Sequence, residues 1–310
     1  MKKYLPYISG ILFSSIFGFS FMFTKEGLQY LHPFHLLAFR FTLALLFLSI
    51  LYKLKVIKLN FRGKKLGLLF LLALAQPGLY FIFETYGIAM TTSAEAGMMI
   101  ALIPVFVTIM GAVFLKEKPK LIQIPFIVFS VAGVIFIALM RDSGSQSGRL
   151  TGIILLLGAV LMGSIFNILS RKLSLNFKPV ELTFTMMFSG TMIFNILAVI
   201  KHNGGFISYI TPLSHPQVFI SIVYLGLFSS VLAFFMLNFT LSKITAAQSA
   251  VFANLTTVIA ILAGVYIRGE NFYWYQIVGG ILIIVGVWGT NYYGSLDNEK
   301  EFSSETGINQ

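Results

Sequence analysis

Cysteine is absent from this sequence, and only 11% of its 310 residues are charged. Without cysteine the chain has no disulfide bond, no thiolate zinc site and no cysteine nucleophile. Soluble domains carry about 25% charged residues on average. This chain has too little polar surface for a water-soluble fold, because 57% of its residues are hydrophobic. The composition therefore indicates a membrane protein that crosses the bilayer several times.

Ten runs of the sequence are apolar and long enough to cross a bilayer, which takes about 20 residues in a helix. The runs are continuously apolar and do not alternate with a period of two, which favours helices over a β-barrel. The predicted spans cover residues 5–23, 34–52, 66–87, 93–115, 121–140, 150–170, 180–200, 217–240, 246–267 and 274–293. The sequence thus predicts an all-α integral membrane protein with ten transmembrane helices.

Lysine and arginine are distributed unevenly between the two predicted sides of the membrane. With the N-terminus inside, 16 of them fall on the inner side and five on the outer side, and Arg40 lies within the second span. Cytoplasmic loops are enriched in these residues. We therefore interpret the net charge of +11 as a topology signal and expect no nucleic-acid partner. Both termini are predicted to face the cytoplasm, in a multi-pass protein of the cell membrane.

The sequence also contains an internal repeat. At a constant offset of 153 residues, Gly111 aligns with Gly264 and Glu117 with Glu270. Each copy has five spans, and because five is odd, the second copy enters the membrane from the opposite side. We predict a five-helix repeat over residues 1–145, an inverted five-helix repeat over 146–295 and a disordered cytoplasmic tail over 296–310. Inverted repeats are typical of secondary transporters, whose binding site lies near the midplane where the halves meet.

Three segments of the first half, Tyr86–Ala94, Leu102–Phe106 and Phe114–Lys118, have weaker repeats in the second half at Asn238–Ser242 and Ile267–Glu270. Together these segments resemble the EamA-type transporters of the drug/metabolite transporter superfamily. The resemblance covers about residues 5–293. It implies a transporter that moves a small organic metabolite, often an amino acid or related solute and often outward.

Three ionisable residues, Arg40, Glu84 and Glu95, lie in the outer third of the predicted spans. Ionisable side chains inside a membrane are costly and are functional candidates by default. Arg40 and Glu84 either form a structural ion pair, or one carboxylate binds a cationic substrate group or a coupling proton. Glu95 either shares that role or caps the fourth helix, since carboxylates favour helix N-termini. We assign all three to a gate or coupling site on the outer side.

Uncharged polar residues within the spans form a second group of candidates, because an unpaired amide in hydrocarbon is costly. Each of them either contacts a neighbouring helix or faces a wet cavity. Pro77 should kink the third span, and Pro104 the fourth; the ninth span has Thr257 at the matching position and should be less kinked. Aromatic residues near the kinks either pack or line a pocket. The predicted substrate-binding residues are Gln76, Tyr80, Asn167, Asn254, Phe17 and Thr257.

These features favour a secondary transporter working by alternating access, and an exporter in particular. A membrane-embedded enzyme would need several acids or histidines at one face, and a sensor or structural protein would carry a long soluble domain. His32 and His35 lack a third ligand for a metal, and the sequence has no phosphate-binding loop for ATP. We expect no catalytic residue, metal or cofactor. The expected partners are a small-molecule metabolite and the lipid bilayer, with proton coupling and the choice between monomer and homodimer left open.

Overall fold

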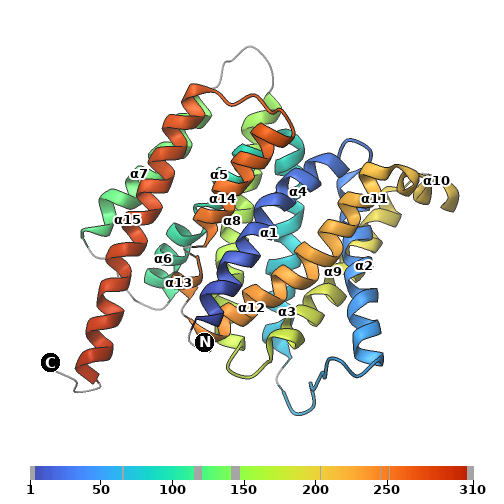
Figure 1. Cartoon of the computed structure of the whole chain (residues 1–310), viewed down its shortest axis with the longest axis horizontal. Coiled ribbons are helices and arrows are strands. Elements are labelled where there is room, and N and C mark those ends of the chain that lie inside the picture. Colours follow the sequence, from blue (N-terminus) through green and yellow to red (C-terminus); the bar gives the residue numbers. More distant parts are fainter. Residues whose placement is uncertain are drawn as a thin grey trace.

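The chain folds into helices at the positions where the sequence predicts spans (Figure 1). The computed structural model describes residues 4–64, 66–114, 121–140, 147–202, 204–244, 246–250 and 252–305. The helices of the first half are α1 (Leu5–Gly27), α2 (Pro33–Lys53), α3 (Gly67–Ala73), η1 (Leu74–Leu79), α4 (Tyr80–Met90), α5 (Ser93–Ile100), α6 (Ile103–Phe114) and α7 (Gln123–Leu139). Those of the second half are α8 (Ser147–Leu173), α9 (Pro179–Lys201), α10 (Phe206–Ile210), η2 (Thr211–Ser214), α11 (Pro216–Val223), η3 (Tyr224–Ala233), α12 (Phe234–Lys243), α13 (Ala246–Ala250), α14 (Ala253–Leu262), η4 (Ala263–Ile267) and α15 (Trp274–Glu305).

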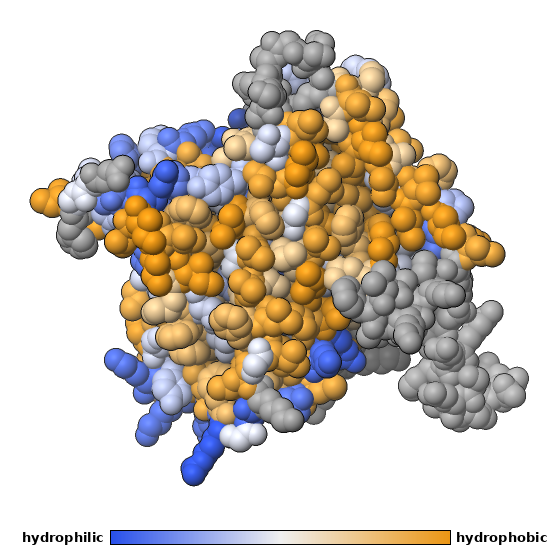
Figure 2. Space-filling view, turned by 180° about the vertical axis from the view of Figure 1, so that it is seen from behind, coloured by the Kyte–Doolittle hydropathy of each residue, from blue (hydrophilic) through white to orange (hydrophobic). Residues whose placement is uncertain are grey.

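Eight helical segments of the described chain are long and apolar enough to cross a membrane. The shorter apolar helices Gln123–Leu139 and Trp274–Thr290 add two more. No strand occurs among the residues that the structure describes. The predicted class, an all-α membrane protein of about ten spans, is therefore confirmed. Figure 2 agrees with it, because hydrophobic residues cover most of the face shown and hydrophilic side chains gather toward its ends.

Two of the predicted kinks are present. In the third span the helix is interrupted at Gln76, whose φ of −148° and ψ of 120° lie outside the helical range, directly before Pro77. In the fourth span α5 ends at Ile100 and α6 begins at Ile103, next to Pro104. Proline lacks the N–H that would continue the helical hydrogen bonds, which accounts for both interruptions.

The structure describes the ninth span in the segments α13 (Ala246–Ala250), α14 (Ala253–Leu262) and η4 (Ala263–Ile267). Residue 251 lies outside the described residues, so the expectation that this span is less kinked than the fourth stays a prediction. At the C-terminus α15 extends to Glu305, and residues 306–310 of the tail lie outside the described residues.

The two halves pack against each other at the centre of the bundle. Helix α1 packs against α14, α12 and η3, and α5 packs against α14. A Cβ atom on Gly97 of α5 would come within 2.4 Å of the Cβ of Ala260 on α14, so glycine is needed for this close approach. Helices α7 and α15 form a pair at one flank (Figure 1). The predicted contact of the fourth and ninth spans is thus present. Glu117, which belongs to the predicted pair Glu117 and Glu270 of the repeat, lies outside the described residues.

Candidate functional site

A cavity of about 80 Å³ lies between the two repeats. Its wall comes from α1, α2, η1, α4, α5 and α6 of the first half and from α8, η3, α12, α13 and α14 of the second. A single buried water needs only about 10–15 Å³ by this measure. The cavity therefore has room for several water molecules or for a small solute, at the place where an inverted-repeat transporter is expected to bind its substrate.

Six of the nine residues predicted to form the site line this cavity: Phe17, Arg40, Gln76, Tyr80, Glu84 and Asn167. The other three, Glu95, Asn254 and Thr257, are not among its lining residues. Sequence reasoning missed Ser20 and Ser229, which also line it. The signal for Ser229 was available, because Ser229 and Ser230 are consecutive polar residues in the middle of the predicted eighth span.

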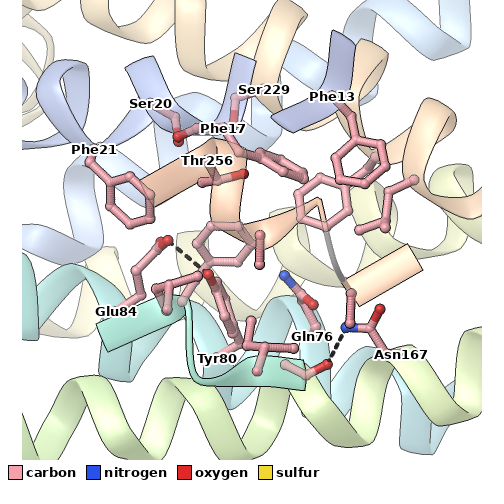
Figure 3. A pocket seen from close by; sticks show the side chains of 18 of the residues that line it. Phe13, Phe17, Ser20, Phe21, Gln76, Tyr80, Glu84, Asn167, Ser229 and Thr256 are labelled. Atoms are coloured by element: carbon pink, nitrogen blue, oxygen red, sulfur yellow. Dashed lines mark hydrogen bonds between the residues drawn. The ribbon is translucent and has the colours of Figure 1, made fainter. Parts of the chain in front are cut away.

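Glu84 is one of two charged residues in the cavity wall. It lies on α4, and only 5% of its surface is exposed. The hydroxyl of Tyr80, one turn earlier on the same helix, donates a hydrogen bond to its Oε1 at 3.0 Å (Figure 3). No basic side chain of the described residues forms an ion pair with it.

Arg40 is the second charged residue of the wall and is 2% exposed. Its Nε donates to the hydroxyl of Ser230 at 2.7 Å, and one terminal nitrogen donates to the hydroxyl of Ser229 at 2.9 Å. The guanidinium carbon lies 4.3 Å from the centroid of the Phe81 ring, a cation–π distance. Both serines belong to η3, so Arg40 of the first repeat is held by the second.

The sequence allowed two interpretations of Arg40 and Glu84, and the direct ion pair is wrong. No guanidinium nitrogen of Arg40 lies within 4.0 Å of a carboxylate oxygen of Glu84. The physical reason is that each group has another partner, serine hydroxyls for Arg40 and a tyrosine hydroxyl for Glu84. The two charges still interact electrostatically, as groups lining one buried cavity must. The site thus presents a cation and an anion that do not neutralise each other by contact.

The other end of the cavity is uncharged. Gln76 and Asn167 lie beside each other there, away from Glu84 (Figure 3). One amide hydrogen of Asn167 is used by the carbonyl of Gly163 at 2.8 Å, one turn earlier on α8. Aromatic rings form much of the remaining wall, and Phe13, Phe17 and Phe21 of α1 contribute three of them. The cavity therefore has a charged end, an amide end and an aromatic wall between them.

Glu95 caps the fourth span, as one of its two sequence interpretations predicted. Its backbone N–H donates to the Thr92 hydroxyl at 3.1 Å, and its carboxylate accepts from the Thr92 N–H at 3.1 Å. This reciprocal pair is a capping box. The second carboxylate oxygen accepts from the amide of Gln276 at 2.9 Å, so Glu95 joins α5 to α15.

Thr257 and Asn254 lie on α14 outside the cavity wall. The hydroxyl of Thr257 contacts the carbonyl of Gly97 at 2.8 Å, which links α14 to α5 at the tight crossing of the two repeats. This is the helix–helix contact that the sequence analysis kept as the alternative for such residues. The side-chain oxygen of Asn254 is buried and has no hydrogen-bond partner within the described structure.

Comparison with known proteins gives a consistent result. The model of the EamA-like transporter family matches residues 5–139 and 150–292, one match in each half. A crystal structure superposes with a TM-score of 0.63 over 92% of this chain and 96% of that chain, at 16% sequence identity. At that identity the likeness concerns the fold alone.

Similar curated proteins are named as transporters. The uncharacterized transporter YcxC of Bacillus subtilis is 38% identical over 287 residues, 92% of each chain. A probable terminal-alkyne amino-acid exporter of Streptantibioticus cattleyicolor is 25% identical over 227 residues, 73% of each chain. The helical fold, the central cavity between two repeats and both family matches lead to one conclusion: this chain is a multi-pass membrane transporter and belongs to the EamA-like transporter family.

Proposed function

We propose that this transporter exports a small zwitterionic metabolite, such as an amino acid, across the cell membrane by alternating access, with both of its termini in the cytoplasm. The observation that carries the proposal is the pair of buried, opposite charges, Arg40 and Glu84, in one cavity without contact between them. Buried charges are costly unless they are paired. A solute with one carboxylate and one ammonium group supplies the missing partner to each of them.

In the proposed pose the substrate carboxylate lies against the guanidinium of Arg40, and its ammonium group lies against Glu84. Arginine suits this role because its planar group binds carboxylates through several N–H donors. The substrate's remaining part points along the aromatic wall formed by Phe13, Phe17 and Phe21, toward the amides of Gln76 and Asn167. An apolar or weakly polar side chain fits that surface best. The similarity to a protein named as an amino-acid exporter supports the same class.

A ligand series on the purified protein tests the proposal. An amino acid that binds the folded state raises its apparent melting temperature. The matching N-acetyl compound and the matching amide each lack one of the two charges and should give a shift that is at least several-fold weaker. Exchange of the labelled amino acid across proteoliposome membranes then tests transport. Equal shifts for the zwitterion and both singly charged analogues would contradict the proposed pairing.

Two variants separate charge from hydrogen bonding at Glu84. Glu84→Gln keeps an oxygen that accepts from Tyr80 but removes the negative charge, and we expect about a tenfold or larger loss of affinity for the zwitterion. Tyr80→Phe keeps the charge and removes the hydroxyl, and its loss should be smaller. If Glu84→Gln retains full affinity but its transport no longer responds to pH, Glu84 carries a coupling proton and not the substrate ammonium.

A further inference from the structure

Outside the cavity, three charged side chains join the two repeats at the end of the bundle where α4 and α5 meet. Arg268, which follows η4, forms an ion pair with Glu26 of α1 through its Nη1. Its Nε lies 3.3 Å from Oε1 of Glu270. The side chains of Arg268 and Glu270 are only 13% and 11% exposed.

Glu270 extends this network to the first turn of α5. Its carboxylate accepts hydrogen bonds from the N–H and the hydroxyl of Ser93 at 3.2 and 2.9 Å and from the N–H of Ala94 at 3.3 Å. A carboxylate is favourable at a helix N-terminus. Gly264 makes the approach possible, because a Cβ at that position would lie 2.6 Å from a carboxylate oxygen of Glu270.

The neighbour of Glu26 holds the other side of the same turn. The ammonium group of Lys25 donates to the carbonyls of Ile88, Ala89 and Thr91 at 2.8, 3.1 and 2.6 Å, at the C-terminal end of α4. The last turn of α1 is thus bound to α4 directly and to α5 through Arg268 and Glu270. Earlier turns of α1 and α4 form the cavity wall, with Ser20 on α1 and Glu84 on α4.

We propose that Glu26, Arg268 and Glu270 form a latch, which closes the cavity toward the side of the membrane where the α4–α5 turn lies. Substrate leaves or enters on that side only when α1 and η4 separate from the α4–α5 turn, and this separation breaks the latch. The latch therefore shifts the conformational equilibrium toward the closed state by the free energy of its contacts. This inference rests on the proposed alternating access.

The absence of cysteine makes a clean test possible. Ser20→Cys puts a thiol in the cavity wall, and a membrane-impermeant thiol reagent is applied from each side, using intact cells and inverted vesicles. With the latch intact, labelling from the side of the α4–α5 turn should be slow. Arg268→Gln should raise that rate at least about two- to fivefold, the range expected for one exposed ion pair, because it removes the contacts to both Glu26 and Glu270. Glu26→Gln should act in the same direction, and it is the safer variant for folding because the Glu26 side chain is 31% exposed.

Lys64→Gln is the matched control. Lys64 forms an ion pair of 2.6 Å with Glu181 at the opposite end of the bundle, where α3 and α9 begin. In the Lys64→Gln variant, the thiol of Ser20→Cys should be labelled from the latch side no faster than in the parent. Fast labelling of the parent, no change in both latch variants, or an equal rise in the control would each overturn the latch. Binding of the zwitterion is measured separately, so failure of the proposed function is distinguishable from failure of the latch.

Discussion

At the scale of single residues, burial and hydrogen bonding decide which polar side chains are free to bind a solute. Arg40 and Glu84 are both buried and both face the cavity. Glu95 is buried as well, but both of its carboxylate oxygens are used by Thr92 and Gln276. All three residues lie within predicted spans, so their position in the sequence does not distinguish a substrate-binding role from a structural one. Only the partners distinguish a binding residue from one that holds two helices together.

Substitution of Glu95 tests this distinction. Glu95→Ala removes the capping box and the bond to Gln276, and we expect a loss of about 1–3 kcal/mol in the free energy of unfolding. Glu95→Gln should lose less, because glutamine also completes a capping box. Neither variant should change the affinity for substrate by more than about twofold. A large loss of affinity in Glu95→Gln at unchanged melting temperature would return Glu95 to the binding site.

His32 provides a pH-dependent prediction at the same scale. It caps α2 by accepting a hydrogen bond from the N–H of Phe34, and its ring lies near Tyr86 and His35. Burial, and then the charge of Lys201, lower the pKa of His32 below its ordinary value of 6.5. As the pH falls, His32 takes up its proton in the unfolded chain before it does so in the folded chain. Its contribution to the free energy of unfolding is therefore constant above pH 6.5 and decreases as the pH drops below that value.

We therefore expect a lower melting temperature at about pH 5.5 than at about pH 7.5, and a smaller difference between the two in His32→Asn. Asparagine retains an oxygen that caps the helix but has no proton to gain. The reduction should be partial, because His35, whose pKa is also lowered by burial, remains beside position 32. His215→Asn is the control, since that ring stacks on Tyr30 and makes no contact with this cluster in the described structure. An equal effect of both variants would contradict the prediction.

At the scale of helices, the central crossing of α5 and α14 depends on small residues. The Cα of Gly97 approaches Ala260 so closely that an added Cβ would lie 2.4 Å from the alanine Cβ. The neighbouring Thr257 hydroxyl bonds to the Gly97 carbonyl across the same contact. Because the two helices belong to different repeats, a change in their spacing affects the whole interface between the halves.

Gly97→Ala should lower the free energy of unfolding by about 1–3 kcal/mol, the usual cost of adding a methyl group to a packed interior. Gly67→Ala is the control, since a Cβ at the start of α3 meets no atom within 4 Å. Thermal unfolding of both variants in one detergent provides the comparison. Equal melting temperatures of the two variants would show that the α5–α14 crossing accommodates an added methyl group, which would contradict the prediction.

At the scale of the whole molecule, the two repeats use the same device at opposite ends of the bundle. Lys25 donates to the carbonyl of Ile88 at the end of α4. Arg171 donates to the carbonyl of Leu241 at 2.9 Å, near the end of α12. Ile88 aligns with Leu241 at the repeat offset of 153 residues, and Lys25 aligns with Arg171 at an offset of 146 residues in the earlier part of the repeat. An inverted repeat places such equivalent contacts at opposite sides of the membrane.

The orientation in the membrane is testable in the same cysteine-free chain. Lys58→Cys lies in the exposed linker between α2 and α3, and Gly205→Cys lies before α10, where a Cβ meets no atom within 4 Å. With cytoplasmic termini, an impermeant reagent added to intact cells should label position 205 and not position 58. Permeabilised cells, in which both positions should react, are the control. The reverse pattern would place the termini outside.

The sequence by itself determined the properties that depend on local composition. A bilayer requires about 20 apolar residues per span and a fully hydrogen-bonded backbone, so hydropathy alone located the helices. Proline lacks an N–H, so Pro77 and Pro104 predicted two interruptions. The odd number of spans per repeat fixed the inversion. The sequence also selected six of the residues that line the cavity, five of them because polar side chains in apolar runs are few and the sixth, Phe17, as an aromatic residue.

Only the tertiary structure decided which of these polar residues are already occupied. Arg40 bonds to serines about 190 positions later in the chain, and Glu26 pairs with Arg268 across 242 positions. No spacing along the sequence encodes such contacts, because they depend on how the second repeat packs against the first.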